Sequence, residues 1–319
     1  MKHVSSLGNG TMKITAATLW VSCFSVAVAA GLPVQEPDTL TFQDIPYLYE
    51  PDFFVIDSMK VAFIDTGKGE PILFIHGVGS DLSQWDKNYP ELAKGNRVLG
   101  IDLPGFGKSD KPIIDYSLDF YCDVIETLLA KRDIEEVTLV GHSFGGHLAL
   151  YFSLHRQERV KALVIVDAAG IQEFTPDQKK FILTQYDIER LARVTPQELR
   201  FGLQLGFVKW EDRYEETVQQ RIALSQSSEY RKYAFAVNKC VVAMLDTNVK
   251  GELENVTVPT LIVWGADDVL VPVNVAHEAH NLIEGSELII IRECGHFPMI
   301  EKSSEFNEAV ERFVGVRNE

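Results

Sequence analysis

Cysteine is scarce in this 319-residue chain, which has only four, at positions 23, 122, 240 and 294. So few cysteines exclude a small fold held together by a disulfide framework. If the apolar N-terminal segment described below is removed, three remain and at least one is unpaired within the chain. Cys294 lies two residues before a histidine, but we expect it to serve as a small buried hydrophobic residue.

Basic residues are also in short supply, because 30 Lys and Arg stand against 46 Asp and Glu, a formal net charge of −16. A chain of this charge is repelled by nucleic acids and by anionic lipid surfaces, so we expect neither as a partner. The hydrophobic content of 46% and charged content of 24% are ordinary for a globular protein, and no repeat or low-complexity stretch stands out.

The glycine patterns of nucleotide-binding loops are missing. Residues 100–110 are rich in glycine, but they lack the G-x-x-x-x-G-K-[ST] spacing, and no G-x-G-x-x-G follows an expected strand. We therefore expect this loop to shape a crevice or simply to turn the chain, and we expect neither a cofactor nor a metal.

The N-terminus carries the one long apolar stretch outside the expected core, residues 14–30. Lys13 precedes it, no acidic residue occurs before Glu36, and small residues at 27–29 form an Ala-Val-Ala cleavage site. This pattern predicts a secretory signal peptide over residues 1–30, and therefore a secreted or periplasmic protein.

The alternative for this stretch is an uncleaved membrane anchor. Seventeen residues interrupted by Thr and Ser are too few for a comfortable membrane span, so after signal cleavage we expect no stable span. Met12 could be the true start, since the residues before it add nothing that a signal peptide needs.

Alternating strands and helices follow an N-terminal arm at residues 31–52. Apolar runs predict strands at 53–56, 60–65, 71–75, 97–101, 137–140, 162–166, 260–264 and 287–291. Helical patterns occur at 84–93, 117–130, 147–152, 176–186, 196–205, 214–226, 273–283 and 304–314. The alternation stops over residues 171–256, where helical patterns dominate. The alternation and its interruption together predict an α/β fold, in which a mostly parallel, doubly wound sheet is interrupted by one helical insertion.

Gly141-His-Ser-Phe-Gly145 follows the β-branched run at 137–140 and precedes a helical pattern. A G-x-S-x-G turn between a strand and a helix exposes the serine hydroxyl at the top of the sheet. Ser143 is therefore the candidate nucleophile.

A serine hydroxyl needs a base to remove its proton, and the base needs an acid to hold its tautomer. His296 lies in a loop directly after the expected strand 287–291, whereas His277 and His280 fall inside a helical pattern. For the acid, Asp267 and Asp268 follow the strand 260–264, and Asp167 follows the strand 162–166. Order and spacing favour Asp268.

Acyl chemistry also needs an oxyanion hole made by two backbone N–H groups. We expect one from Phe144, directly after the nucleophile, and one from Val78, in the glycine-rich loop after strand 71–75.

These motifs together resemble the α/β-hydrolase superfamily over about residues 53–315, in its serine-nucleophile, esterase- or lipase-like branch. The matches are His76-Gly77, Asp102-Leu-Pro-Gly-Phe-Gly-Lys-Ser109, Gly141-His-Ser-Phe-Gly-Gly146, Gly265-Ala-Asp-Asp268 and Gly295-His-Phe-Pro298. The resemblance implies a core at 53–170 and 257–319, a helical cap at 171–256, and Asp268 rather than Asp267 as the acid.

From this resemblance we expect a serine hydrolase that cleaves a small apolar carboxylic ester through an acyl-enzyme. Carbon–carbon bond hydrolases, proline iminopeptidases and haloperoxidases share the fold and the triad, so they stay open as alternatives. A non-enzymatic binding module is disfavoured because all three triad positions are filled. The sequence leaves the oligomeric state open.

Overall fold

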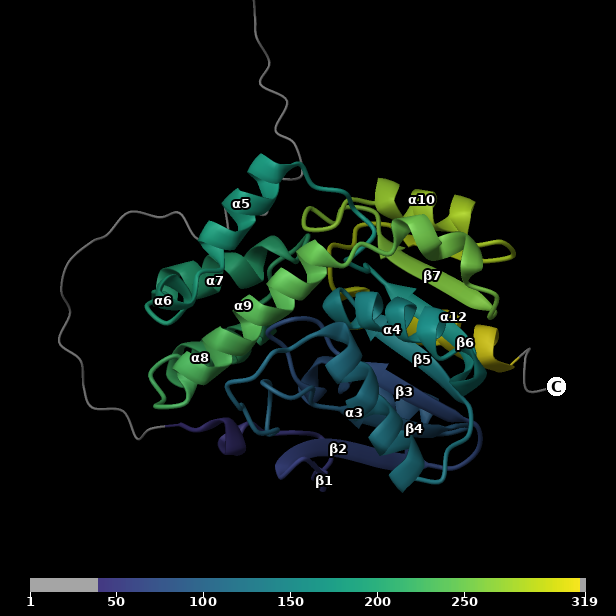
Figure 1. The fold of residues 1–319 in the computed structure, drawn as a ribbon, viewed down its shortest axis with the longest axis horizontal. Coiled ribbons are helices and arrows are strands. Elements are labelled where there is room, and N and C mark those ends of the chain that lie inside the picture. The colour runs from purple at the N-terminus through teal and green to yellow at the C-terminus, as the bar shows by residue number, and fades with distance from the viewer. Residues whose placement is uncertain (1–39, 316–319) are drawn as a thin grey trace, which may run out of the picture.

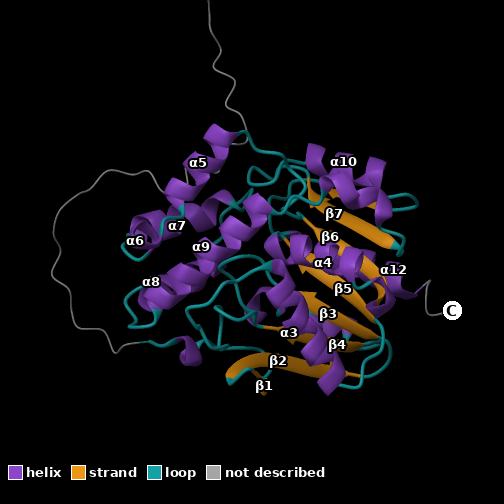
Figure 2. Cartoon of the chain, in the orientation of Figure 1, coloured by secondary structure: helices purple, strands orange, loops and turns teal. Residues whose placement is uncertain are grey.

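One eight-stranded sheet organises the described part of the chain, residues 40–315 of a computed structural model (Figures 1 and 2). The strand order is β1-β2-β4-β3-β5-β6-β7-β8. The predicted signal peptide and the first part of the arm lie outside the described residues. Within these residues, no helix is long and apolar enough to cross a membrane.

The six strands from β3 to β8 are parallel, whereas β1 and β2 form an antiparallel edge. The predicted α/β class with a mostly parallel sheet is therefore confirmed. The strands are β1 (Asp52–Ile56), β2 (Met59–Gly67), β3 (Pro71–Ile75), β4 (Arg97–Ile101), β5 (Val137–His142), β6 (Val160–Val166), β7 (Thr260–Gly265) and β8 (Glu287–Ile291).

Both faces of the sheet are buried, because successive residues along a strand point to opposite sides. In β3, Leu73 belongs to one buried cluster and Phe74 to another. The first cluster includes residues of α3 (Leu118–Lys131), α4 (Phe144–His155) and α10 (Asn274–Leu282). The second includes residues of η2 (Leu82–Trp85), α2 (Tyr89–Leu92), α11 (Pro298–Glu301) and α12 (Ser303–Gly315). The sheet is thus doubly wound, as predicted.

Residues 171–256 are called the helical segment here, and the helices between Pro176 and Asp246 gather at one end of the sheet (left in Figure 1). The helical segment forms α5 (Pro176–Gln185), α6 (Ile188–Leu191), α7 (Pro196–Leu205), η4 (Asp212–Tyr214), α8 (Glu215–Leu224), α9 (Tyr230–Asp246) and η5 (Lys250–Asn255). Buried side chains of α9, such as Val237 and Val241, share a cluster with α3 and α4. Helix α9 therefore joins the helical segment to the α/β core.

The helix predicted at 84–93 is wrong as a continuous element. The chain forms the short η2, three turn residues and then α2, with Pro90 at the second position of α2. Proline lacks a backbone N–H and clashes with the carbonyl four residues earlier, so a helix cannot run through it from residue 84. Proline is tolerated in the first turn of α2, because a backbone N–H at that position would have no partner within the helix.

The three cysteines of the described chain, Cys122, Cys240 and Cys294, are free and buried. Burial raises the pKa of Cys122 and Cys240 to about 12, so both thiols stay protonated at neutral pH. As expected for Cys294, they pack as small hydrophobic residues.

Candidate active site

Ser143 sits in a strained turn between β5 and α4. Its φ of 52° and ψ of −115° are rare for a residue with a side chain. The turn closes only because glycines flank it: a Cβ on Gly141 would lie 2.2 Å from the Gly145 carbonyl oxygen, and one on Gly145 would lie 2.3 Å from that of Ile75. The predicted strand–turn–helix context of Ser143 is therefore present.

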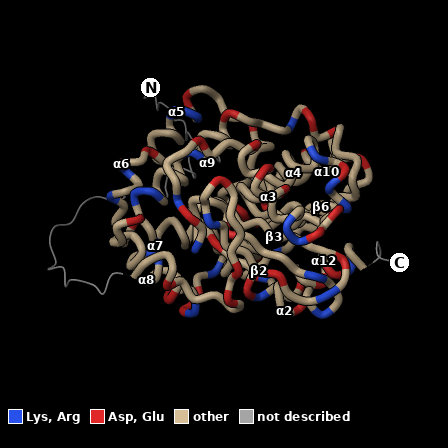
Figure 3. The backbone as a smooth tube through the Cα atoms, turned by 60° about the horizontal axis from the view of Figure 1, so that its bottom comes forward, with Lys and Arg blue, Asp and Glu red and all other residues tan. Residues whose placement is uncertain are grey.

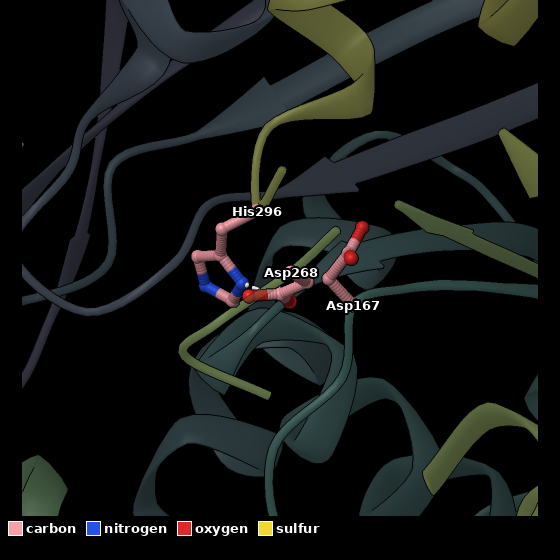
Figure 4. A group of neighbouring side chains, drawn as sticks. All are labelled: Asp167, Asp268 and His296. Carbon is pink, nitrogen blue, oxygen red and sulfur yellow. Dashed lines mark hydrogen bonds and ion pairs between the residues drawn. The ribbon is translucent and has the colours of Figure 1, made fainter. Parts of the chain in front are cut away.

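His296 and Asp268 form a hydrogen bond, with 2.7 Å between Nδ1 and Oδ2 (Figure 4). The other oxygen of Asp268 accepts the backbone N–H groups of Leu270, at 2.7 Å, and Val271, at 3.1 Å. These bonds fix the carboxylate, and the carboxylate in turn fixes the tautomer of the ring, leaving Nε2 as the basic nitrogen.

The other candidates lie elsewhere. Asp267 is exposed, although Asp268 beside it is buried. His277 and His280 are exposed on α10, and His280 contacts Ser286 instead. Among the histidines that follow the helical segment, only His296 lines the cavity described below.

Asp167, the third candidate acid, is fully buried beside Asp268 (Figure 4). Its Oδ1 accepts the N–H of Gly265 at 3.0 Å, whereas its Oδ2 has no hydrogen-bond donor. Burial, and then the charge of Asp268, raise the pKa of Asp167 well above its usual value. A protonated Asp167 satisfies these observations, since its Oδ2 can then donate a hydrogen bond to the neighbouring Asp268 side chain.

Asp167, Asp268 and His296 also offer three possible metal-ligand atoms within 4.8 Å of one another. However, Nδ1 of His296 faces Asp268 at hydrogen-bond distance and carries the shared proton, so its lone pair is not free for a metal. We interpret this group as a hydrogen-bonded cluster.

His142, which the sequence did not single out, ties the serine turn to the His296 loop. Its Nε2 donates to the His296 carbonyl oxygen at 2.7 Å, and the two ring centroids are 4.6 Å apart. Burial lowers the pKa of His142 well below its usual value, so the ring is neutral. The G-H-S motif contained this residue, but nothing in it indicated a partner far along the chain.

The loop after β3 forms a turn from Gly77 to Ser80. Ser80 donates to the Gly77 carbonyl at 3.1 Å, and Gly79 has a φ of 77°, the position of a type II turn that favours glycine. His76 Nδ1 donates to the same carbonyl at 2.8 Å, and the side chain of Gln84 accepts the Gly77 N–H at 3.2 Å. Val78 lies at the centre of this turn, and we call residues 76–81 the Val78 loop.

Phe144, the other expected donor, is the first residue of α4. The N–H groups of the first helical turn have no partner inside the helix. The backbone N–H of Phe144, directly after Ser143, is therefore a donor that needs no partner within α4.

A cavity of about 560 Å³ lies between the helical segment and the strand ends. Ser143, His296 and Val78 line it from the core, whereas residues 100–110 do not. Its apolar wall comes mostly from the helical segment and includes Leu191, Val194, Leu199, Leu203, Phe207, Trp210, Tyr214 and Val237.

Charged side chains also line this cavity, among them Asp86 and Lys87. Burial, followed by the charge of Asp81, raises the pKa of Asp86 to about 7. Burial, followed by repulsion from Arg213, lowers the pKa of Lys87. Most of the cavity wall is thus apolar, and it includes ionisable side chains such as Asp86 and Lys87.

Comparisons with known proteins agree with this architecture. A family model described as alpha/beta hydrolase fold matches residues 70–303. An uncharacterized protein of Mycobacterium tuberculosis is 30% identical over 275 residues, which cover 82% of this chain and 80% of that protein. A 2-hydroxy-6-oxo-6-(2'-aminophenyl)hexa-2,4-dienoic acid hydrolase of Metapseudomonas resinovorans is 29% identical, with coverage of 84% and 92%.

A solved structure, that of a bacterial membrane phospholipase A, superposes with a TM-score of 0.71 and 26% identity. The match covers 85% of this chain and 87% of the phospholipase. The family match spans most of the chain and includes the Ser143 turn and the His296 loop. The chain therefore belongs to the α/β-hydrolase fold family, and it is a hydrolase.

Proposed function

We propose that this protein cleaves carboxylic esters through an acyl-enzyme formed on Ser143. The observation that carries the proposal is the Asp268–His296 hydrogen bond at the edge of a cavity that Ser143 also lines. This combination of a turn serine that lines the cavity, an oriented imidazole and a buried carboxylate is what nucleophilic acyl transfer requires.

In the proposed reaction, Ser143 Oγ attacks the ester carbonyl while His296 Nε2 removes the hydroxyl proton. The tetrahedral oxyanion is held by the N–H groups of Val78 and Phe144. His296 then gives the proton to the leaving alcohol, and the acyl-enzyme remains. A water molecule, deprotonated by His296, attacks this ester, and the acid leaves as Ser143 regains its proton.

An ester is favoured by the predominantly apolar wall of the cavity, which suits an acyl chain. The likeness to a phospholipase A at 26% identity supports the same substrate class. The strong acidity of the chain, −16 in all, disfavours anionic substrates at long range.

Labelling with a fluorophosphonate probe tests the nucleophile directly. We expect the intact protein to be labelled at Ser143, and Ser143→Ala to abolish labelling and to lower kcat by roughly 10⁴-fold or more. Ser153→Ala, on α4 and away from the cavity, is the matched control and should retain both the labelling and the kcat of the parent. Labelling that persists at another serine in Ser143→Ala would remove the assignment.

A carbon–carbon bond hydrolase on the same triad is the second candidate. It is favoured by the 29% identity to a hydrolase named for a dienoic acid substrate. A substrate panel separates the two: p-nitrophenyl esters of graded chain length beside an aryl dienoic acid of that class. Higher kcat/KM for the dienoic acid than for every ester would favour the second candidate.

We also propose that residues 1–30 direct export and are then removed. N-terminal sequencing of the exported protein should find Ala30 or Gly31 as the first residue. A mature chain that still contains Trp20 would show that the segment is an anchor instead.

A further inference from the structure

The Val78 loop is held from outside the core by two side chains of the helical segment. Arg221, on α8, donates from Nη1 to the Gly79 carbonyl oxygen at 2.6 Å. Tyr233, on α9, donates its hydroxyl to the same oxygen at 3.0 Å. The Gly79 carbonyl thus accepts hydrogen bonds from two different helices, each more than a hundred residues after it in the sequence.

Arg221 also reaches the far end of the loop. Its Nη2 lies 3.0 Å from Oδ2 of Asp81, and the Asp81 side chain is only 1% exposed. The other oxygen of Asp81 accepts the N–H of Ser83 and so caps η2. Gln84 of η2 in turn accepts the Gly77 N–H. Arg221 is therefore connected to both ends of the turn that contains Val78.

Other ion pairs of the helical segment differ from this one. Arg231, on α9, pairs with Glu189 within the segment, and both side chains are more than half exposed. The Arg221 side chain is 14% exposed and its partner comes from the core. A buried ion pair contributes little net stability once its desolvation is counted, so stability alone is a weak explanation for it.

We propose that Arg221 and Tyr233 are positioning residues that set the oxyanion site through the Gly79 carbonyl. This inference rests on the proposed function, in which the Val78 N–H holds the oxyanion. With Gly77 fixed from the core and Gly79 fixed from the helical segment, the peptide between them has one orientation. The helical segment is then a necessary part of the catalytic machinery as well as the wall of the cavity.

The physical basis is the short range of the oxyanion interaction. A backbone donor acts only when it lies about 2.7–3.1 Å from the position of the oxyanion, and loss of one donor costs about 10²–10³ in kcat. A loop that loses its outer restraint would present this donor for only part of the time. The loss should appear in kcat, because the oxyanion exists only in the transition state and the intermediate.

The test compares Arg221→Gln and Tyr233→Phe with Arg231→Gln, whose residue lies on α9 outside the cavity. We expect kcat to fall about tenfold or more in Arg221→Gln and several-fold in Tyr233→Phe, as fractions of the donor loss quoted above. The fall should be the same for acetate and for longer acyl esters. Affinity for a trifluoromethyl ketone, whose adduct with Ser143 carries the oxyanion, should drop in parallel, and Arg231→Gln should match the parent.

Arg221→Gln leaves Asp81 buried without its cation and could unfold the protein. The double variant Arg221→Gln/Asp81→Asn removes both charges and keeps a capping oxygen at position 81, so it should recover the parent Tm while kcat stays low. The inference is wrong if the folded variants keep the parent kcat and the parent affinity for the ketone. It is also wrong if their activity falls only through a higher KM for long-chain esters, because Arg221 and Tyr233 would then act only as part of the cavity wall. If the parent itself is not labelled at Ser143, the proposed function fails first and the inference falls with it.

Discussion

Asp167 and Asp268 illustrate how two adjacent carboxyl groups take different roles. Asp268 faces His296 and two backbone N–H groups, whereas Asp167 has one N–H donor and an oxygen without any. The raised pKa of Asp167 follows from its burial and from the neighbouring charge. Two buried carboxylates at such a short separation do not both ionise readily, so one holds the proton.

This assignment predicts opposite results for two asparagine variants. Asp167→Asn keeps an acceptor for Gly265 and a donor for Asp268, so kcat should stay within a few-fold of the parent. Asp268→Asn should lower kcat by about 10⁴-fold, because it presents the wrong hydrogen-bonding group to His296. The reverse order in a p-nitrophenyl ester assay would identify Asp167 as the acid that orients His296.

The raised pKa of Asp86 leads to a second prediction, about how stability depends on pH. An unfolded aspartate has a pKa near about 3.9, whereas burial raises the pKa of Asp86 to about 7. Between these values the folded state binds more protons than the unfolded state, so the contribution of this group to stability falls as pH rises from about 4 to about 7.

Asp86→Asn removes this dependence, and its Tm should exceed that of the parent by more at pH 8 than at pH 5. Thermal unfolding at the two values measures the difference. Asp115→Asn is the control, because the Asp115 side chain is 83% exposed. An equal Tm gap at both pH values would mean that Asp86 does not titrate near neutrality.

The sequence singled out Ser143, Asp268 and His296 as candidates because each lies in a short motif with a required order, and the structure joins Asp268 to His296 beside the cavity that Ser143 lines. It could not predict Arg221 or Tyr233, whose partners in the Val78 loop lie 142 and 154 positions away. Nothing in their local sequence distinguishes them from the other arginines and tyrosines of the helical segment. Contacts that depend on how two elements pack carry no local pattern.

At the scale of elements, the buried strands were the most predictable. The expected runs at 71–75 and 97–101 coincide with β3 and β4, in each of which four of the five residues are buried. Strands buried on both faces read as continuous apolar runs bounded by turn residues. Residues 84–93 were harder to predict, because their apolar residues keep a helical spacing across Pro90. A helical backbone cannot continue through that proline.

The Ser143 turn depends on two glycines in adjacent elements, and this gives a prediction about folding. Gly145→Ala places a Cβ 2.3 Å from the Ile75 carbonyl oxygen, which belongs to the central strand β3 and cannot move away. We expect a loss of about 1–3 kcal/mol or more in the free energy of unfolding, as for other overpacked sites.

Gly251→Ala is the matched control, since a Cβ there meets nothing within 4 Å. Urea unfolding followed by fluorescence gives both values. If Gly145→Ala is as stable as Gly251→Ala, the helix–strand contact at this glycine is looser than the structure indicates.

At the scale of the whole molecule, composition predicted a globular protein with an acidic excess, but not how its elements are arranged. The acidic excess is spread over the chain, with Lys and Arg interspersed among Asp and Glu (Figure 3). The loss of strand–helix alternation indicated a helical insertion. Its placement over the strand ends, and therefore the cavity, depends on tertiary packing of α9 against α3 and α4.

That placement leads to a prediction about substrate preference. Because the helical segment supplies most of the apolar wall, kcat/KM should rise with acyl length from acetate to a medium chain. Each methylene that is fully buried contributes up to about 0.8 kcal/mol, or roughly fourfold. Leu203→Ala removes part of this wall and should flatten the series, whereas Leu183→Ala, at a position 37% exposed on α5 outside the cavity, should leave it unchanged. A p-nitrophenyl ester series measures both variants, and an intact protein without any chain-length preference would show that the acyl group does not enter this cavity.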